Sequence, residues 1–227
     1  MQDCTSLKHL DTSRPIEAGM DSGNMLSIVF GQQKGKTYKV LKEMCTLPPS
    51  GPRELADQFI AYFKPHHRKI LKLYYDRSMN NYKKVGADMA TQIKKNIEYY
   101  ADGTRTGWTV QLMSLGQGNI GSNLEYRVFM DLLSGNLERN LFKLEIDQYN
   151  CSNLKSEMEV TKTKVATGRD TSGMIVKLKT GDKLPTHRLP KESTNLTDAL
   201  KYLILRKEWI RIWQLGRRSS GTGMDPH

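Results

Sequence analysis

The sequence predicts an α/β fold with a mixed central sheet, in which an antiparallel three-strand meander is followed by parallel strands, and helices flank the sheet. The first observation is three short strand patterns separated by tight turns near the start of the chain, which is typical of a meander. The second is an alternation of apolar helical stripes with compact apolar strands, which is the order of β-α-β units.

The meander strands are predicted at 16–21, 25–30 and 37–44, with turns at Ser22-Gly23-Asn24 and at 31–35. Pro52 suits the first turn of a helix, and apolar residues four apart continue this helix until the chain reaches Pro65. The later strands are predicted at 70–75, 108–115 and 141–146, and the later helices around 89–97, 122–132, 153–159 and 195–204.

Domain organisation is predicted from composition. Residues 1–14 are polar and patternless and indicate a linker or an artificial remnant, and residues 15–215 form one structured domain. Within it, residues 160–191 are rich in turns and basic side chains, which predicts a hairpin or a long loop. Residues 216–227 are small and polar and indicate a disordered tail.

Charge favours a polyanionic partner, because 35 Lys and Arg against 24 Asp and Glu leave a formal net charge of +11. Nucleic acid is the leading candidate. The sequence has neither a run of roughly 20 apolar residues nor an apolar signal core, so we expect a cytoplasmic protein without a membrane partner. The cysteines at 4, 45 and 151 lack the paired spacing of a zinc site, which indicates free thiols.

Two glycine-rich segments imitate nucleotide-binding loops. Residues 31–37, Gly-Gln-Gln-Lys-Gly-Lys-Thr, have one residue too few between the glycines and precede a strand, so we expect a hairpin turn. Residues 116–121 form a complete G-x-G-x-x-G between a strand and a helix, which keeps a dinucleotide enzyme open as an alternative. A glycine loop beside an active-site edge explains the same residues.

Three carboxylates lie at informative places. Asp21 ends the first strand, Asp76 ends the first strand after a helix, and Asp198 lies in the first turn of the last long helix. If the first and fourth strands are neighbours, Asp21 and Asp76 stand side by side at one sheet edge and the final helix brings Asp198 to them. Each residue alone is explained by a turn or a helix start, and only their joint placement favours a shared site.

Clustered carboxylates repel one another, and a divalent cation relieves that repulsion. Oxygen ligands suit Mg²⁺ or Mn²⁺, and two such ions can activate water for phosphodiester hydrolysis. Glu43 and Asp147 are further acids that could contact a metal or its water.

Several segments resemble the nuclease domain of tailed-phage or prophage terminase large subunits. The end of the first strand carries a metal-binding Asp in that family, the fourth strand carries the second acid, and the last helix carries an acid followed by Ala-Leu-x-Tyr. Two further similarities are a helix that begins near Asn123 and carries Arg127 and Val128, and a strand leading to a Cys-x-x-Leu helix, here Cys151 to Leu154. The matching segments here are 16–21, 73–76, 195–202, 123–133 and 144–154.

The resemblance covers about residues 14–206 and implies a ribonuclease-H-like nuclease domain. It implies an endodeoxyribonuclease that cleaves concatemeric viral DNA during genome packaging by a two-metal mechanism, with Asp21, Asp76 and Asp198 as ligands. Its implied partners are double-stranded DNA, a terminase ATPase domain, the small subunit and the portal, within a transient packaging motor in the bacterial cytoplasm. The alternative is a non-catalytic ribonuclease-H-like module for DNA binding or packaging assembly.

The sequence departs from the family pattern in three respects. Relatives often continue the first strand as Asp-x-Asn, whereas Ser22-Gly23-Asn24 follows Asp21 here. Some relatives place a His just before the last acid, whereas the nearest here is His187, eleven residues before Asp198. The ATPase half is absent from these residues, so we expect either an excised domain or a stand-alone product.

The basic segment 160–191 is predicted to hold DNA phosphates without reading sequence. Its candidate DNA-binding residues are Lys162, Lys164, Arg169, Lys177, Lys179, Lys183 and Arg188. An ordinary solvated loop is the alternative. We expect Trp209 and Trp213 to pack against the fold or another subunit, with stacking on bases as the alternative, and His66 and His67 to lie in a surface loop.

Overall fold

A computed structural model describes residues 10–76, 88–118, 120, 122–134, 142–165, 175–178, 180–212 and 214. Its main sheet has six strands in the order β5-β4-β1-β2-β3-β6. β1, β2 and β3 are antiparallel neighbours, β4 is parallel to β1, β5 is parallel to β4, and β6 is parallel to β3. The predicted fold class is therefore confirmed. The strands are β1 (Ile16–Ser22), β2 (Leu26–Lys34), β3 (Thr37–Thr46), β4 (Ile70–Tyr75), β5 (Thr109–Leu112) and β6 (Lys143–Ile146).

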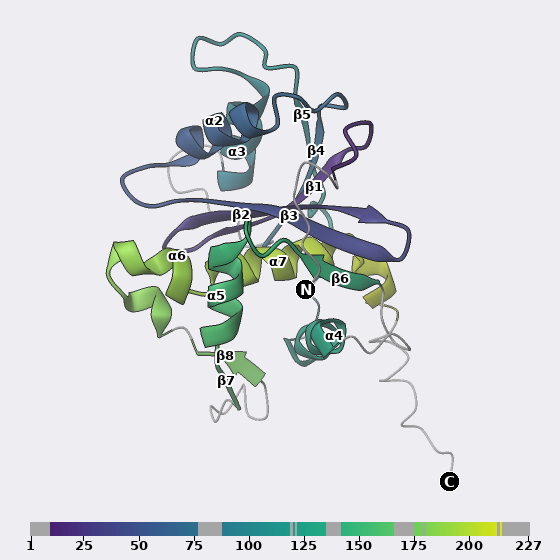
Figure 1. Ribbon diagram of the computed structural model, residues 1–227, viewed down its shortest axis with the longest axis vertical. Coiled ribbons are helices and arrows are strands. Elements are labelled where there is room, and N and C mark those ends of the chain that lie inside the picture. Colours follow the sequence, from purple (N-terminus) through teal and green to yellow (C-terminus); the bar gives the residue numbers. More distant parts are fainter. Residues whose placement is uncertain are drawn as a thin grey trace.

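Helices cover both faces of the sheet (Figure 1). Helices α2 and α3 lie on one face, and α4, α5, α6 and α7 lie on the other. The helices are α2 (Pro52–Tyr62), α3 (Met89–Glu98), α4 (Ser122–Ser134), α5 (Ser152–Val160), α6 (Leu189–Glu192) and α7 (Asn195–Lys207). Within the described residues, no helix is long and apolar enough to cross a membrane.

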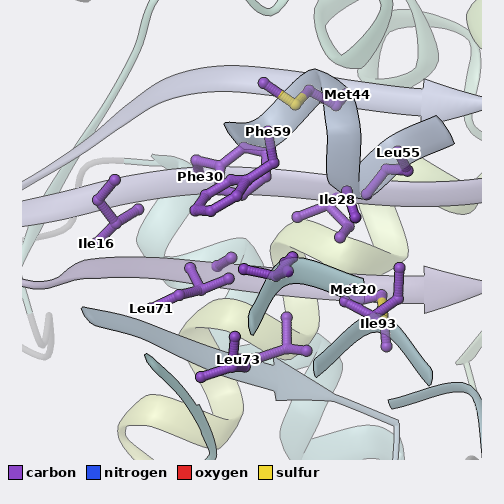
Figure 2. Packing of buried hydrophobic residues seen from close by; sticks show 14 of the residues in the cluster. Ile16, Met20, Ile28, Phe30, Met44, Leu55, Phe59, Leu71, Leu73 and Ile93 are labelled. Atoms are coloured by element: carbon purple, nitrogen blue, oxygen red, sulfur yellow. The ribbon is translucent and has the colours of Figure 1, made fainter. Parts of the chain in front are cut away.

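The face under α2 and α3 is an apolar core built by strand alternation. Ile16, Ala18 and Met20 of β1 point into this core, because every second side chain of a strand lies on the same face. Phe30 from β2 and Phe59 from α2 stack there (Figure 2), and their ring centroids are 5.4 Å apart. This core fixes which β1 residues must face the opposite side.

The opposite face of β1 carries Gly19, against which α7 packs very closely. A Cβ atom at Gly19 would lie 2.0 Å from the carbonyl oxygen of Ala199 and 2.6 Å from Cβ of Leu203. Only glycine leaves room for this approach. Gly19 precedes Asp21 by two residues, and Ala199 follows Asp198, so this contact sets how near α7 comes to the end of β1.

The basic segment that follows α5 contains a short hairpin of β7 (Thr163–Val165) and β8 (Ile175–Lys177). It then passes through two single-turn 3₁₀ helices, Gly181–Lys183 and Thr186–Arg188, before α6. The sequence left a hairpin or a long loop open here, and the structure has a hairpin followed by short helical turns.

Three details differ from the sequence-based expectation. β2 continues to Lys34 through an irregularity at Phe30/Gly31, where we expected a turn from residue 31. β5 is limited to four residues, shorter than the predicted strand. His66 is buried rather than in a surface loop, because its Nε2 bonds the carbonyl of Arg14 at 2.8 Å and its ring stacks on Trp108.

Residues near the predicted linker contact the sheet. The side-chain amide of Gln32 donates to the carbonyl of Asp11 at 3.0 Å, and the N–H of Asp11 donates back at 2.9 Å. The boundary at residue 14 stays a prediction, as does the tail after residue 215, which lies outside the described residues.

The contact at Gly19 generates a prediction. Gly19→Ala forces the new methyl group against α7, and we expect a loss of about 1–3 kcal/mol in the free energy of unfolding from overpacking. Urea denaturation followed by circular dichroism measures it. Gly118→Ala is the matched control, because its added Cβ would meet only ordinary contact, 3.4 Å from Trp209. Equal stability of the two variants would contradict the close approach of α7.

Candidate functional site

Strand register brings Asp21 and Asp76 together. β1 and β4 are parallel, with Met20 paired to Tyr75, and each acid is the next residue of its chain. Met20 and Tyr75 point into the core under α2 and α3, so the following residues point to the α7 face. The two acids therefore lie at the same sheet edge and on the same face, as predicted for neighbouring first and fourth strands.

Asp198 lies on α7, which packs on that same face. Its side chain is buried, with 3% of the residue exposed. The start of α7 is fixed to the β1–β2 turn, because the side-chain amide of Asn195 donates to the carbonyl of Met25 at 3.0 Å. A Cβ at Gly23 would lie 3.0 Å from Oδ1 of Asn195 and 3.2 Å from Oδ2 of Asp21, so the Asp21 carboxylate is beside the start of α7.

The pKa of Tyr202, which lies one turn after Asp198 on α7, is influenced by all of these acids. Burial raises the pKa of its hydroxyl far above the usual value, and the charges of Asp198, Asp76, Asp21 and Glu125 raise it further, in that order. Neighbouring negative charges favour the protonated form of a phenol. The three predicted acids and Glu125 of α4 thus act on one place.

Glu125 is half-buried, and burial is the largest cause that raises the pKa of its carboxyl. The positive charges of Lys201 and Arg206 lower this pKa, whereas Asp76 and Asp198 raise it. The neighbouring acids therefore already repel one another at this site, which is the situation that a bound cation relieves.

Two lysines neutralise part of the negative charge. Nζ of Lys177, at the end of β8, lies 2.7 Å from Oδ1 of Asp198, and Nζ of Lys201 lies 3.3 Å from the same oxygen. Lys201 is also 3.8 Å from Oε2 of Glu125. Lys177 was predicted to bind DNA, and its ammonium group is here bonded to Asp198, so the hairpin reaches the acids directly.

The donor set suits a hard divalent cation, because every candidate ligand is a carboxylate oxygen. In the part of the chain that the structure describes, no group of three or more His, Cys, Asp or Glu side chains is gathered closely enough to hold a metal ion. Asp21, Asp76 and Asp198 are thus on one face and electrostatically coupled without forming a closed ligand cage, and Oδ1 of Asp198 is bonded to two ammonium groups.

The two further acids proposed from the sequence have structural partners. Glu43 accepts hydrogen bonds from the backbone N–H groups of Asn153 and Leu154, at 2.9 and 2.7 Å, at the start of α5. Asp147 accepts from the N–H groups of Tyr149 and Asn150 at 3.0 and 3.1 Å within its own turn. These bonds account for Glu43 and Asp147 without a metal.

Apart from Lys177, the predicted DNA-binding residues divide into three groups. Lys162, Lys164 and Lys183 are exposed. Arg188 is exposed but paired with Glu192, to which its Nε donates at 2.7 Å, and the neighbouring His187 is also exposed. Arg169 and Lys179 lie outside the described residues.

Within the glycine loop, the described residues Gln117 and Gly118 contact the end of α7. The carbonyl of Gly118 accepts hydrogen bonds from Arg206 at 2.9 Å and from the indole N–H of Trp209 at 3.1 Å. These bonds give the Gly118 carbonyl a packing role against the end of α7. The packing role predicted for Trp209 is confirmed, and Trp213 lies outside the described residues.

The other glycine-rich segment is a hairpin connection, as predicted. β2 ends at Lys34, Gly35 has a φ of 60°, and β3 begins at Thr37. Glycine readily takes this conformation, and a strand rather than a helix follows it.

Sequence reasoning missed three residues of the site. Lys201 forms an ion pair with Glu125 and also contacts Asp198. Glu157 of α5 accepts a hydrogen bond from the N–H of Thr197, the residue before Asp198. Lys201 had a usable signal, because a side chain three positions after Asp198 lies on the same helix face. Glu125 and Glu157 depend on contacts between distant segments, which spacing along the chain does not reveal.

Burial of Glu157 generates a pH prediction. Burial raises the pKa of its carboxyl from 4.5 to about 7, although bonds from Thr197 and Ser193 act in the opposite direction. The folded protein thus binds this proton more tightly than the unfolded chain. The stabilisation is full below the unfolded pKa, and it is lost as the pH rises towards 7, by roughly 3 kcal/mol in total.

We therefore expect the neutral variant Glu157→Gln to flatten the fall in unfolding free energy between pH 4.5 and 7. Urea denaturation at several pH values measures this slope. Glu159→Gln, on the exposed side of the same helix, is the control and keeps the slope. A wild-type slope in Glu157→Gln would show that another group causes the pH dependence.

Comparison with known proteins finds similarity at the level of structure. A scan against protein-family models finds no match, and a search of the curated proteins also finds none. The nuclease domain of the large terminase of bacteriophage SPP1, with bound Mn, is similar with a TM-score of 0.44 and 14% identity, over 86% of this chain and 89% of that chain.

Two structures of the large terminase of a thermophilic bacteriophage are also similar. The complex with ADP has a TM-score of 0.48 and 11% identity, over 84% of this chain and 39% of that chain. The complex with ATP-gamma-S has a TM-score of 0.47 and 10% identity, over 88% of this chain and 45% of that chain. The chain thus spans less than half the length of those two terminase chains.

Proposed function

We propose that this chain is a metal-dependent DNA endonuclease that hydrolyses phosphodiester bonds, acting as the nuclease domain of a phage packaging terminase. The observation that carries the proposal is the placement of Asp21 and Asp76 at the same end of the neighbouring strands β1 and β4, next to α7, which packs on β1 and carries Asp198. Mutually repelling, partly buried carboxylates are costly to keep together unless a cation stabilises them.

Asp21, Asp76 and Asp198 would hold Mg²⁺ or Mn²⁺, with two ions as the working hypothesis. The metal would supply an activated water and stabilise the charge that develops on the phosphodiester. Lys201 keeps its ammonium group between Asp198 and Glu125, at 3.3 and 3.8 Å. This arrangement limits the repulsion between the two acids, and it would bring a positive charge near a bound phosphate.

Double-stranded DNA is the proposed substrate. The net charge of +11 attracts the phosphate backbone, and the exposed Lys162, Lys164 and Lys183 belong to the segment whose Lys177 bonds Asp198. Contacts of this kind orient DNA without reading its sequence. A role in packaging implies an ATPase domain, a small subunit and a portal as further partners.

A non-catalytic module for DNA binding or packaging assembly is the second candidate. The observation that favours it is the bonding of Oδ1 of Asp198 to Lys177 and Lys201, because an ammonium ion balances a carboxylate without any metal. Such a module binds DNA but leaves supercoiled DNA intact in the presence of Mn²⁺.

The first test is cleavage of supercoiled plasmid in Mn²⁺. We expect wild-type protein to nick and linearise the plasmid, and Asp76→Ala to reduce cleavage to background with an unchanged circular dichroism spectrum. Asp57→Ala on α2 is the matched control, because this exposed acid lies on the other face of the sheet, and it should cleave as wild type does. Full activity in Asp76→Ala would exclude the assignment of the site.

The second test concerns DNA binding. Lys164→Ala combined with Lys183→Ala removes two phosphate contacts, so the slope of log Kd against log salt concentration should decrease by about 2. Fluorescence anisotropy of a dye-labelled duplex at several salt concentrations measures it. Lys64→Ala combined with Lys95→Ala, two exposed lysines near α2 and α3, should leave the slope unchanged. If the slope of log Kd against log salt concentration is equal in both double variants, Lys164 and Lys183 do not contact the DNA.

A further inference from the structure

The first turn of α7 is bonded by a side chain from another helix. Thr194 precedes this turn and makes no side-chain capping bond. Glu157 of α5 provides it instead, since its Oε2 accepts from the backbone N–H of Thr197 at 2.9 Å and from the Thr197 hydroxyl at 3.3 Å. Its Oε1 accepts from the hydroxyl of Ser193 at 2.8 Å. A carboxylate thus does the work of an N-cap and is completely buried, at 0% exposed.

Helix α5 is itself fixed in the same way. Cys151, at its start, makes no side-chain capping bond, and Glu43 of β3 accepts from the N–H groups of Asn153 and Leu154. Two buried carboxylates therefore connect the sheet to α5 and α5 to α7. Asp198 is the next residue after Thr197, where this connection ends.

We propose that Glu157 is a positioning residue for Asp198, which fixes the first turn of α7 so that the Asp198 carboxylate faces Asp21 and Asp76. The inference rests on the proposed function, because it gives Glu157 a role in metal binding and cleavage. A local Ser or Asp cap would also satisfy the turn, whereas a cap from α5 additionally ties the turn to that helix, beside the bond that joins Asn195 to the β1–β2 turn.

The experiment compares Glu157→Ala and Glu157→Gln with the wild-type protein. Glu157→Ala removes all three bonds, so Mn²⁺ affinity measured by titration calorimetry should fall roughly tenfold, and kcat for DNA cleavage should fall with it. KM for DNA should not change, because the basic hairpin is untouched. Glu157→Gln keeps one oxygen acceptor and should restore part of both losses. Glu159→Ala, on the same helix but exposed, is the control and should behave as wild type.

A second measurement needs no metal. Amide hydrogen exchange at Thr197 and Asp198 should accelerate in Glu157→Ala and remain as in wild type in Glu159→Ala, because only the former loses the bond to the Thr197 N–H. Should Glu157→Ala not fold, Ser193→Ala removes one bond to Oε1 and is expected to give a smaller change of the same kind.

The outcomes separate the two claims. Unchanged Mn²⁺ affinity and kcat in folded Glu157→Ala, with Asp198→Asn inactive, would overturn the positioning role and leave the proposed function standing. Wild-type protein that neither binds Mn²⁺ nor cleaves DNA would overturn the proposed function and the positioning role with it.

Discussion

The packing of α7 against β1 at Gly19 is the constraint on which the rest of the structure depends. No side chain larger than hydrogen fits between the β1 backbone and the carbonyl of Ala199, so the two elements are held at backbone contact. Strand alternation places Met20 in one core and Asp21 on the other face, and the parallel pairing with β4 places Asp76 beside it. The helix that touches Gly19 is the one that carries Asp198. This close contact thus helps to set how near the acids of three distant segments lie to one another.

Bringing acids together has an electrostatic cost, which the structure meets with basic groups from different elements. Lys177 comes from the hairpin and Lys201 from α7 itself, and both contact Asp198. The acids still act strongly on Tyr202 and Glu125, whose pKa values are raised by burial first and then by neighbouring carboxylates. A site of this kind favours additional positive charge, whether it arrives as a metal ion or with the basic groups of the hairpin. Both proposed functions depend on this need for positive charge. A metal ion provides it in the nuclease, and lysine ammonium groups provide it in the non-catalytic module.

The sequence predicted most of the fold because its apolar residues recur at the regular spacing of helices and strands. Apolar residues four apart placed α2, a compact apolar run placed β4 with both ends correct, and glycine turns separated the strands of the meander. The sequence placed Asp21 beside Asp76 on the condition that the first and fourth strands are neighbours, and the sheet order has β1 next to β4. What the sequence could not predict depends on contacts between distant segments. Glu43 and Glu157 were visible only as single acids, and the structure places them as caps of helices that begin far away in the chain. His66 became a buried stacking partner of Trp108 for the same reason.

The central claim is that Asp21, Asp76 and Asp198 form one cation-binding site. The most direct measurement is a crystal structure of the protein soaked in Mn²⁺, with anomalous diffraction data collected to locate the metal. We expect an anomalous peak within coordination distance, about 2.0–2.4 Å, of oxygens from these three carboxylates. Well-ordered density for the three acids with no peak between them, and with Lys177 still bonded to Asp198, would contradict the account.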